Sequence, residues 1–184
     1  TVFATNTSTL LPSQFAEITG RPEKFLALHF ANMIWINNMA EIMGHTGTDK
    51  AVFDSLVDFA KAIGMLPLPI YKEQPGHILN SMLVPYCISA LELWVKEVSD
   101  PETIDKTWMK SFGSPKGPFA ILDIIGINTV YNVAKLNIDA SPLMAQIVER
   151  LENEFIDRGH LGMPTGKGFY NYPNPAYEAK TFLQ

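Results

Sequence analysis

The sequence has a single cysteine among its 184 residues, which excludes an internal disulfide framework. Cys87 lies in the apolar segment MLVPYCISALELW, so we expect a buried thiol with no nucleophilic role. Such sparing use of cysteine fits the reducing cytosol. We therefore predict a cytoplasmic protein.

Basic residues and long apolar runs are also scarce. The chain has fourteen Lys and Arg and nineteen Asp and Glu, which gives a net charge of −5, and it has no run of basic residues. This charge balance argues against binding to nucleic acid. No segment has the roughly 18–20 uncharged apolar residues of a membrane span. The opening TVFATNTSTLLPSQF lacks the basic region and apolar core of a signal peptide. We expect neither a nucleic acid nor a membrane as partner.

Three of the four histidines have no partner at a spacing that would bind a metal. His45, His77 and His160 belong to no HxxxH or HExxH pattern, so we predict no metal site. We interpret these three as surface residues or as core residues with satisfied hydrogen bonds.

The chain changes character near residue 72. Before it, the pattern predicts strands over 2–5, 25–30, 39–45 and 65–71, a short helix over 12–19 and an amphipathic helix over 49–63. After the KEQPG linker, it predicts helices over 78–98, from 101, over 117–133 and over 141–155, with a loose tail after Tyr172. We thus predict an α+β chain with two domains, residues 1–72 and 73–184. The first holds the last strands and a helix of an α/β layer, and the second is all-α.

The chain opens directly on a strand that has no lead-in. A sheet of only three or four such strands would expose an edge strand, which normally pairs with a further strand. We therefore expect Thr1 to be a cut within a longer chain.

His29 and Glu41 form the strongest candidate pair. If FLALHF and MAEIMGH pair as antiparallel strands across the WINN segment, these two residues can face each other on one side of the sheet. A histidine held by a carboxylate is suited to act as a general base near neutral pH. The alternative is a histidine that serves only the core.

Two further regions carry polar candidates. Asn6 and Ser8 lie in a polar turn directly after the first strand, where α/β sheets bind ligands, although such residues also simply bond their own turn. Asn80 lies within an apolar helix, and either faces a cavity or helps to cap the helix. The glycine-rich GMPTGKGFYNY lacks the flanking strand and helix of a phosphate loop, so we interpret it as a turn anchored by Phe169 and Tyr170.

Five ordered segments resemble the 3-hydroxyacyl-CoA dehydrogenases, most of all the bacterial 3-hydroxybutyryl-CoA dehydrogenases. They are TNTSTL, LHFAN followed by Glu41, QPGHILNSMLVPY, GSPKGPFAILDIIGIN and PTGKGFYNY, and they span nearly the whole chain. The resemblance implies that residues 1–72 are the C-terminal part of an NAD-binding Rossmann domain. Residues 73–184 would then be a helical domain that contributes to substrate binding and dimerisation, and the pyrophosphate loop would lie upstream of Thr1.

The resemblance also implies roles for individual residues. His29 matches the catalytic histidine and Glu41 its carboxylate partner. Ser8 and Asn80 match residues that contact substrate, and the residues near the nicotinamide would be Asn32, Ser8 and Asn6.

The resulting hypothesis is NAD-dependent oxidation of a short-chain L-3-hydroxyacyl-CoA by the parent protein, with the fragment inactive by itself. Two alternatives remain open: a non-catalytic dimerisation module, or a dehydrogenase of free 3-hydroxy acids. We also expect a homodimer, because the helices after Gly76 are apolar on more than one face.

Overall fold

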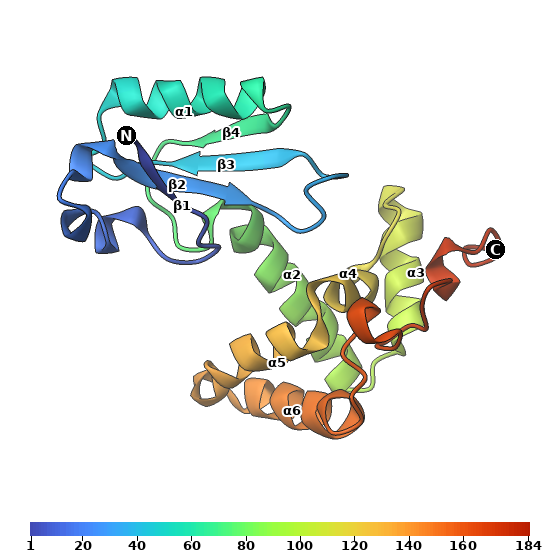
Figure 1. Ribbon diagram of the computed structural model, residues 1–184. Coiled ribbons are helices and arrows are strands. Elements are labelled where there is room, and N and C mark those ends of the chain that lie inside the picture. Colours follow the sequence, from blue (N-terminus) through green and yellow to red (C-terminus); the bar gives the residue numbers. More distant parts are fainter. The chain divides into compact units, whose positions relative to one another are not determined.

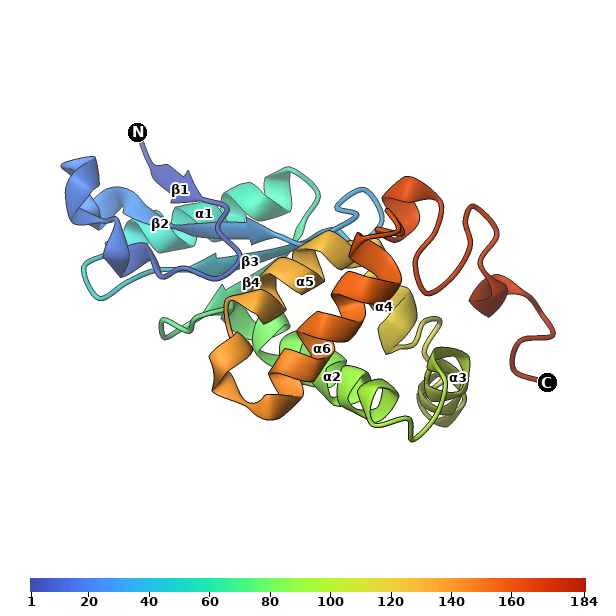
Figure 2. The ribbon, with the colours of Figure 1, turned by 90° about the horizontal axis from the view of Figure 1, so that it is seen from below.

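The computed structural model describes residues 1–184, which form two compact units, Thr1–Val84 and Pro85–Gln184 (Figures 1 and 2). The strands are β1 (Phe3–Thr5), β2 (Phe25–Phe30), β3 (Met39–Met43) and β4 (Leu66–Ile70). The α-helices are α1 (Lys50–Ala62), α2 (His77–Val95), α3 (Pro101–Phe112), α4 (Pro118–Ile125), α5 (Ile127–Lys135) and α6 (Pro142–Leu151). The unit boundary falls within α2.

A four-stranded sheet in the order β1-β2-β3-β4 organises the first unit (Figure 1). β2 and β3 are antiparallel, as the sequence predicted, whereas β1–β2 and β3–β4 are parallel. β4 lies at the sheet edge and has a neighbouring strand on one side only. Pro67 and Pro69, which lack a backbone N–H, are tolerated in such an edge strand. The α/β character predicted for this part of the chain is confirmed.

The two faces of this sheet have different neighbours. Leu28 and Ile42 point to the face covered by α1, where they join Leu56 in an apolar cluster. Because side chains alternate along a strand, His29 and Glu41 point to the opposite face. The candidate pair is therefore on the side of the sheet that α1 leaves free.

Two local predictions in the first unit were wrong. Residues 12–19 form two separate 3-10 turns, Pro12–Gln14 and Glu17–Thr19, instead of one short helix. The connection between β2 and β3 is longer than a tight WINN turn: the backbone N–H groups of Ile36 and Asn37 both donate to the Met33 carbonyl.

The second unit packs its helices around aromatic rings. Trp94 lies with its ring centroid 5.4 Å from that of Phe169, and Phe169 in turn contacts Phe119 and Phe155. The predicted helix over 117–133 is two helices, α4 and α5, because Gly126 adopts φ +92° between them. The tail prediction was also wrong: Tyr177 is buried against the ring of Tyr170.

α2 is long and apolar enough to cross a membrane by length and composition, contrary to our expectation that no segment is. A helix in the core of a soluble protein meets the same criterion, so the finding is weak evidence. The first turn of α2 forms part of the candidate active site.

Candidate active site

His29 and Glu41 form a buried hydrogen-bonded pair. They are paired in register on β2 and β3, and Nδ1 of His29 lies 2.8 Å from Oε2 of Glu41. Their residue exposures are 4% and 0%. A carboxylate only accepts, so Nδ1 is the donor of this bond, and in the neutral imidazole the lone pair is then on Nε2. The pairing predicted from the sequence is therefore present in the fold.

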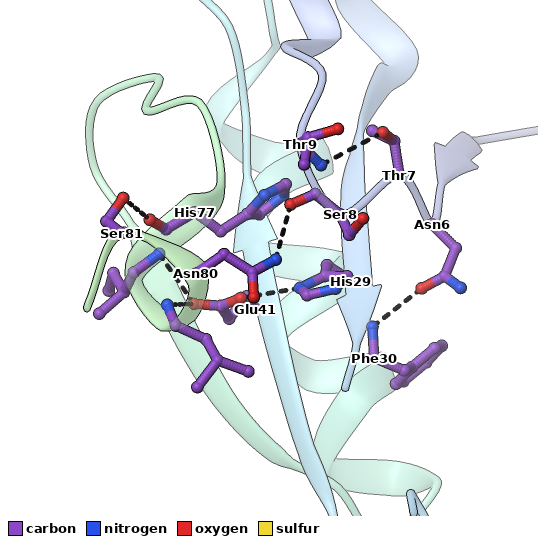
Figure 3. Close-up of polar contacts among 12 residues, drawn as sticks. Asn6, Thr7, Ser8, Thr9, His29, Phe30, Glu41, His77, Asn80 and Ser81 are labelled. Atoms are coloured by element: carbon purple, nitrogen blue, oxygen red, sulfur yellow. Dashed lines mark hydrogen bonds and ion pairs between the residues drawn. The ribbon is translucent and has the colours of Figure 1, made fainter. Parts of the chain in front are cut away.

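The second oxygen of Glu41 binds the beginning of α2. Oε1 accepts hydrogen bonds of 2.9 Å from the backbone N–H groups of both Ile78 and Leu79 (Figure 3). First-turn N–H groups have no partner within a helix, and the helix dipole favours a negative charge at this end. One carboxylate thus orients the His29 ring and closes the N-terminus of a nineteen-residue helix. Sequence reasoning missed this role, because the donors are main-chain groups.

The turn after β1 lies beside the pair. Oδ1 of Asn6 accepts from the backbone N–H of Phe30, the residue that follows His29, at 2.9 Å. Nδ2 of Asn80 donates to the Ser8 carbonyl oxygen at 3.0 Å (Figure 3). Asn6, Ser8 and Asn80, three candidates far apart in the sequence, are therefore gathered around one histidine.

Asn32 is separate from this network. It lies in the connection after β2 and is exposed, and it forms no hydrogen bond with another candidate residue. Its neighbour Met33 adopts φ +58°, a left-handed conformation that begins the turn there.

His77 is a member of the site that sequence reasoning missed. Its ring centroid is 4.8 Å from that of His29, with an angle of 39° between the ring planes. The residue is 0% exposed, yet neither ring nitrogen has a hydrogen-bond partner, so our interpretation of a surface or satisfied core histidine was wrong. Its position directly after the Pro75–Gly76 turn was the only available signal, and no spacing rule links it to His29.

The environment of His77 favours the neutral imidazole. Burial lowers its pKa, and the neighbouring His29 lowers it further, while Glu41 and the Ser8 backbone act in the opposite direction. The site therefore contains two neighbouring, tilted imidazoles and one carboxylate.

Cys87 lies outside this arrangement. Its thiol is buried, and burial together with the nearby Asp105 raises its pKa to about 12. The prediction of an inert thiol agrees with this environment.

Two family descriptions match the chain. Residues 1–74 match the NAD binding domain of 3-hydroxyacyl-CoA dehydrogenase, and residues 76–172 match its C-terminal domain. The human mitochondrial hydroxyacyl-coenzyme A dehydrogenase is 36% identical over 174 residues, covering 94% of this chain and 55% of the human protein. The chain thus spans about half the length of the curated relatives it matches.

Solved structures agree with these matches. A diketoreductase, described for substrate-directed dual catalysis of dicarbonyl compounds, is 52% identical with a TM-score of 0.87, covering 93% of this chain and 59% of its own. The (S)-3-hydroxybutyryl-CoA dehydrogenase of Ralstonia eutropha is 28% identical with a TM-score of 0.77, covering 94% of this chain and 61% of its own. With both family domains matched in order, the chain belongs to the 3-hydroxyacyl-CoA dehydrogenase family.

Proposed function

We propose that this chain supplies the proton-transfer part of an NAD-dependent dehydrogenase that interconverts a 3-hydroxyacyl-CoA and its 3-ketoacyl-CoA. The buried His29–Glu41 pair carries the proposal, because it presents one free imidazole nitrogen of fixed orientation. The chain spans only part of the length of its relatives. The proposed activity therefore belongs to a protein of their full length that contains this chain.

His29 is the general base of the proposed reaction. Nε2 takes the proton of the substrate's 3-hydroxyl group, and the ring becomes an imidazolium whose Nδ1–H remains bonded to Glu41. Because Glu41 is also fixed by two N–H groups of α2, its carboxylate cannot turn away as the charge develops. In the reverse direction the same nitrogen returns the proton to the alkoxide.

Ser8 and Asn80 are the proposed substrate-binding residues. Ser8 is exposed beside the pair, with its hydroxyl available to the reacting oxygen. The Asn80 amide bonds the Ser8 carbonyl through Nδ2. Its Oδ1 stays free for the substrate's acyl-CoA arm.

The residues present fit the nicotinamide end of NAD. The exposed polar turn with Asn6 and Ser8 follows the parallel strand β1 and borders His29, and exposed Asn32 follows the neighbouring strand. No G-x-G-x-x-G turn joins a strand to a helix within residues 1–184, so these residues lack that cradle for the pyrophosphate. When bound, NAD accepts the hydride from C3 of the substrate.

Replacement of His29 tests the assignment. In a full-length protein, His29→Gln should lower kcat for NADH oxidation with acetoacetyl-CoA by about 10²–10⁴-fold, with little change in KM. A matched His45→Gln variant, altered outside the site in the same unit, should retain activity. Turnover near the wild-type value in His29→Gln would rule out this base.

The second candidate is reduction of dicarbonyl compounds that carry no CoA. The 52% identity with the diketoreductase, against 36% with the human hydroxyacyl-CoA enzyme, favours it. A 3-ketoacyl thioester is itself a 1,3-dicarbonyl compound, so one base can serve both reactions. Comparing kcat/KM for acetoacetyl-CoA, free acetoacetate and acetylacetone distinguishes the CoA thioester from the free acid and the diketone.

We also infer a homodimer formed through α2 and the helices that follow it. Only 22% of an apolar 18-residue stretch of α2 is buried within the chain. Large apolar side chains are exposed on these helices, among them Met82, Leu93 and Phe112. Sedimentation of the protein as a monomer at micromolar concentration would contradict the dimer.

A further inference from the structure

A histidine at position 77 is energetically unfavourable, and close packing alone does not explain its presence. Both ring nitrogens are buried without partners, which a phenylalanine ring of similar size would avoid. Its backbone adopts φ +57°, in the left-handed region that non-glycine residues rarely occupy. Strained backbone and unpaired polar groups gather at functional sites. An imidazole at this position therefore needs a reason other than filling space.

The surroundings of His77 are few and well defined. The titratable groups that face it are His29 from β2 and Glu41 from β3, and the Ser8 loop adds a backbone carbonyl. Glu41 is already occupied by His29 and by the first turn of α2. The group nearest to the unpaired nitrogens that changes charge during the proposed reaction is the His29 ring.

We propose that His77 is a positioning residue that stabilises the imidazolium formed on His29, acting as a neutral dipole beside a buried ring. This inference rests on the proposed function. The proton passes from the substrate hydroxyl to Nε2 of His29, and none moves to His77. Because neither His77 ring nitrogen is committed to a hydrogen bond, the ring dipole remains available to interact with the new charge on His29.

The closed environment makes such a dipole effective. His29 is 4% exposed and His77 is 0% exposed, so bulk water does not solvate the charge. Interactions with a charge are stronger in such a region than in water. A second imidazolium at 4.8 Å would oppose the charge on His29, so His77 must stay neutral to help it.

Two substitutions separate the ring from its nitrogens. His77→Phe keeps an aromatic ring and removes the dipole, whereas His77→Asn keeps a dipole in a residue that tolerates the left-handed backbone. In the direction of 3-hydroxyacyl-CoA oxidation, where His29 acts as the base, we expect His77→Phe to lower kcat about tenfold with KM within twofold, and to move the acid limb of the pH–rate profile to lower pH. We expect His77→Asn to retain more of kcat. His160→Phe, in the second unit, is the matched control.

A measurement without substrate or cofactor provides an independent readout. NMR titration of the His29 ring should show its midpoint about one pH unit lower in His77→Phe than in the wild type. Thermal melting of His77→Phe should stay within a few degrees of the wild type, since the lost nitrogens had no partners. If the variant does not fold, His77→Asn decides through the same titration, with a midpoint closer to the wild type expected.

The outcomes keep the two proposals distinct. An unchanged titration and an unchanged kcat in a folded His77→Phe would overturn the role of His77 and reduce it to packing. A shifted titration in a protein inactive toward all three test substrates would overturn the proposed function, while the coupling between the two rings would stand.

Discussion

His29 and Glu41 face each other across two antiparallel strands, with Nδ1 and Oε2 2.8 Å apart. The same carboxylate receives the first two free N–H groups of α2, at Ile78 and Leu79. Orientation of the His29 ring is thereby linked to the position of a helix. A change at Glu41 is expected to affect catalysis far more than stability, provided that the helix bonds survive.

Glu41→Gln tests that separation. The amide oxygen can still accept from α2, but its NH₂ group then faces Nδ1 of His29 and forces the proton onto Nε2. The nitrogen that should accept the substrate proton is thus blocked. We expect kcat to fall about 10²–10⁴-fold, measured as NADH formation from a 3-hydroxyacyl-CoA by a full-length protein.

The matched control is Asp54→Asn, which alters an exposed carboxylate on α1 that pairs with Lys50. It should retain wild-type turnover, and both variants should melt close to the wild type. A Glu41→Gln protein that kept full kcat would show that the tautomer of His29 does not matter.

The part of the site that the sequence predicted follows from local rules. The patterns of two strands close in sequence place His29 and Glu41 on one face, because a one-residue slip of either strand would turn its residue to the opposite face. Equally local rules place the starts of α3 and α6, where the side chains of Asp100 and Ser141 accept a backbone N–H of the first turn.

The parts that were not predicted depend on distant segments. His77 meets His29 only because Glu41 draws the start of α2 onto the sheet. The tail is ordered because Tyr170 packs against Tyr177 and Phe182, a contact that no periodicity predicts. Non-local packing overrode the local expectation in both cases.

Asp105 provides a prediction about pH and stability. It is fully buried and accepts hydrogen bonds from the backbone N–H groups of Phe119 and Ala120 and from the Tyr170 hydroxyl. Burial raises its pKa to about 6 despite these bonds, and the nearby Asp123 adds to the effect. The folded state therefore holds a proton that the unfolded chain releases near its ordinary pKa of 3.8.

The sign of the effect follows from this raised pKa. The contribution to stability is present below pH 4 and is lost as pH rises through about 6; raising the pKa from 3.8 to about 6 corresponds to about 3 kcal/mol. Measured by urea unfolding, the free energy of unfolding should fall less across this pH range in Asp105→Asn than in the wild type. Exposed Asp139→Asn should leave the fall unchanged. Equal falls in Asp105→Asn and the wild type would exclude Asp105 as the source.

Cys87 should react very slowly with alkylating reagents. Its pKa of about 12, against an ordinary 9.0, lowers the thiolate fraction at pH 8 by about a thousandfold. Iodoacetamide should therefore modify the folded protein far more slowly than the protein unfolded in urea. Similar rates in the two states would mean that the thiol is accessible in the native fold.

Gly168 should tolerate no side chain. A Cβ there would overlap the carboxylate of Asp123, which accepts the backbone N–H groups of Phe169 and Tyr170 and fixes the turn. Either the carboxylate or the turn must move, so we expect Gly168→Ala to lower the free energy of unfolding by about 3 kcal/mol, measured by urea denaturation. Lys167→Ala, in the same turn with an exposed side chain, should change it by less than about 0.5 kcal/mol. If the two variants unfold at the same urea concentration, the tight contact between Gly168 and Asp123 does not stabilise the second unit.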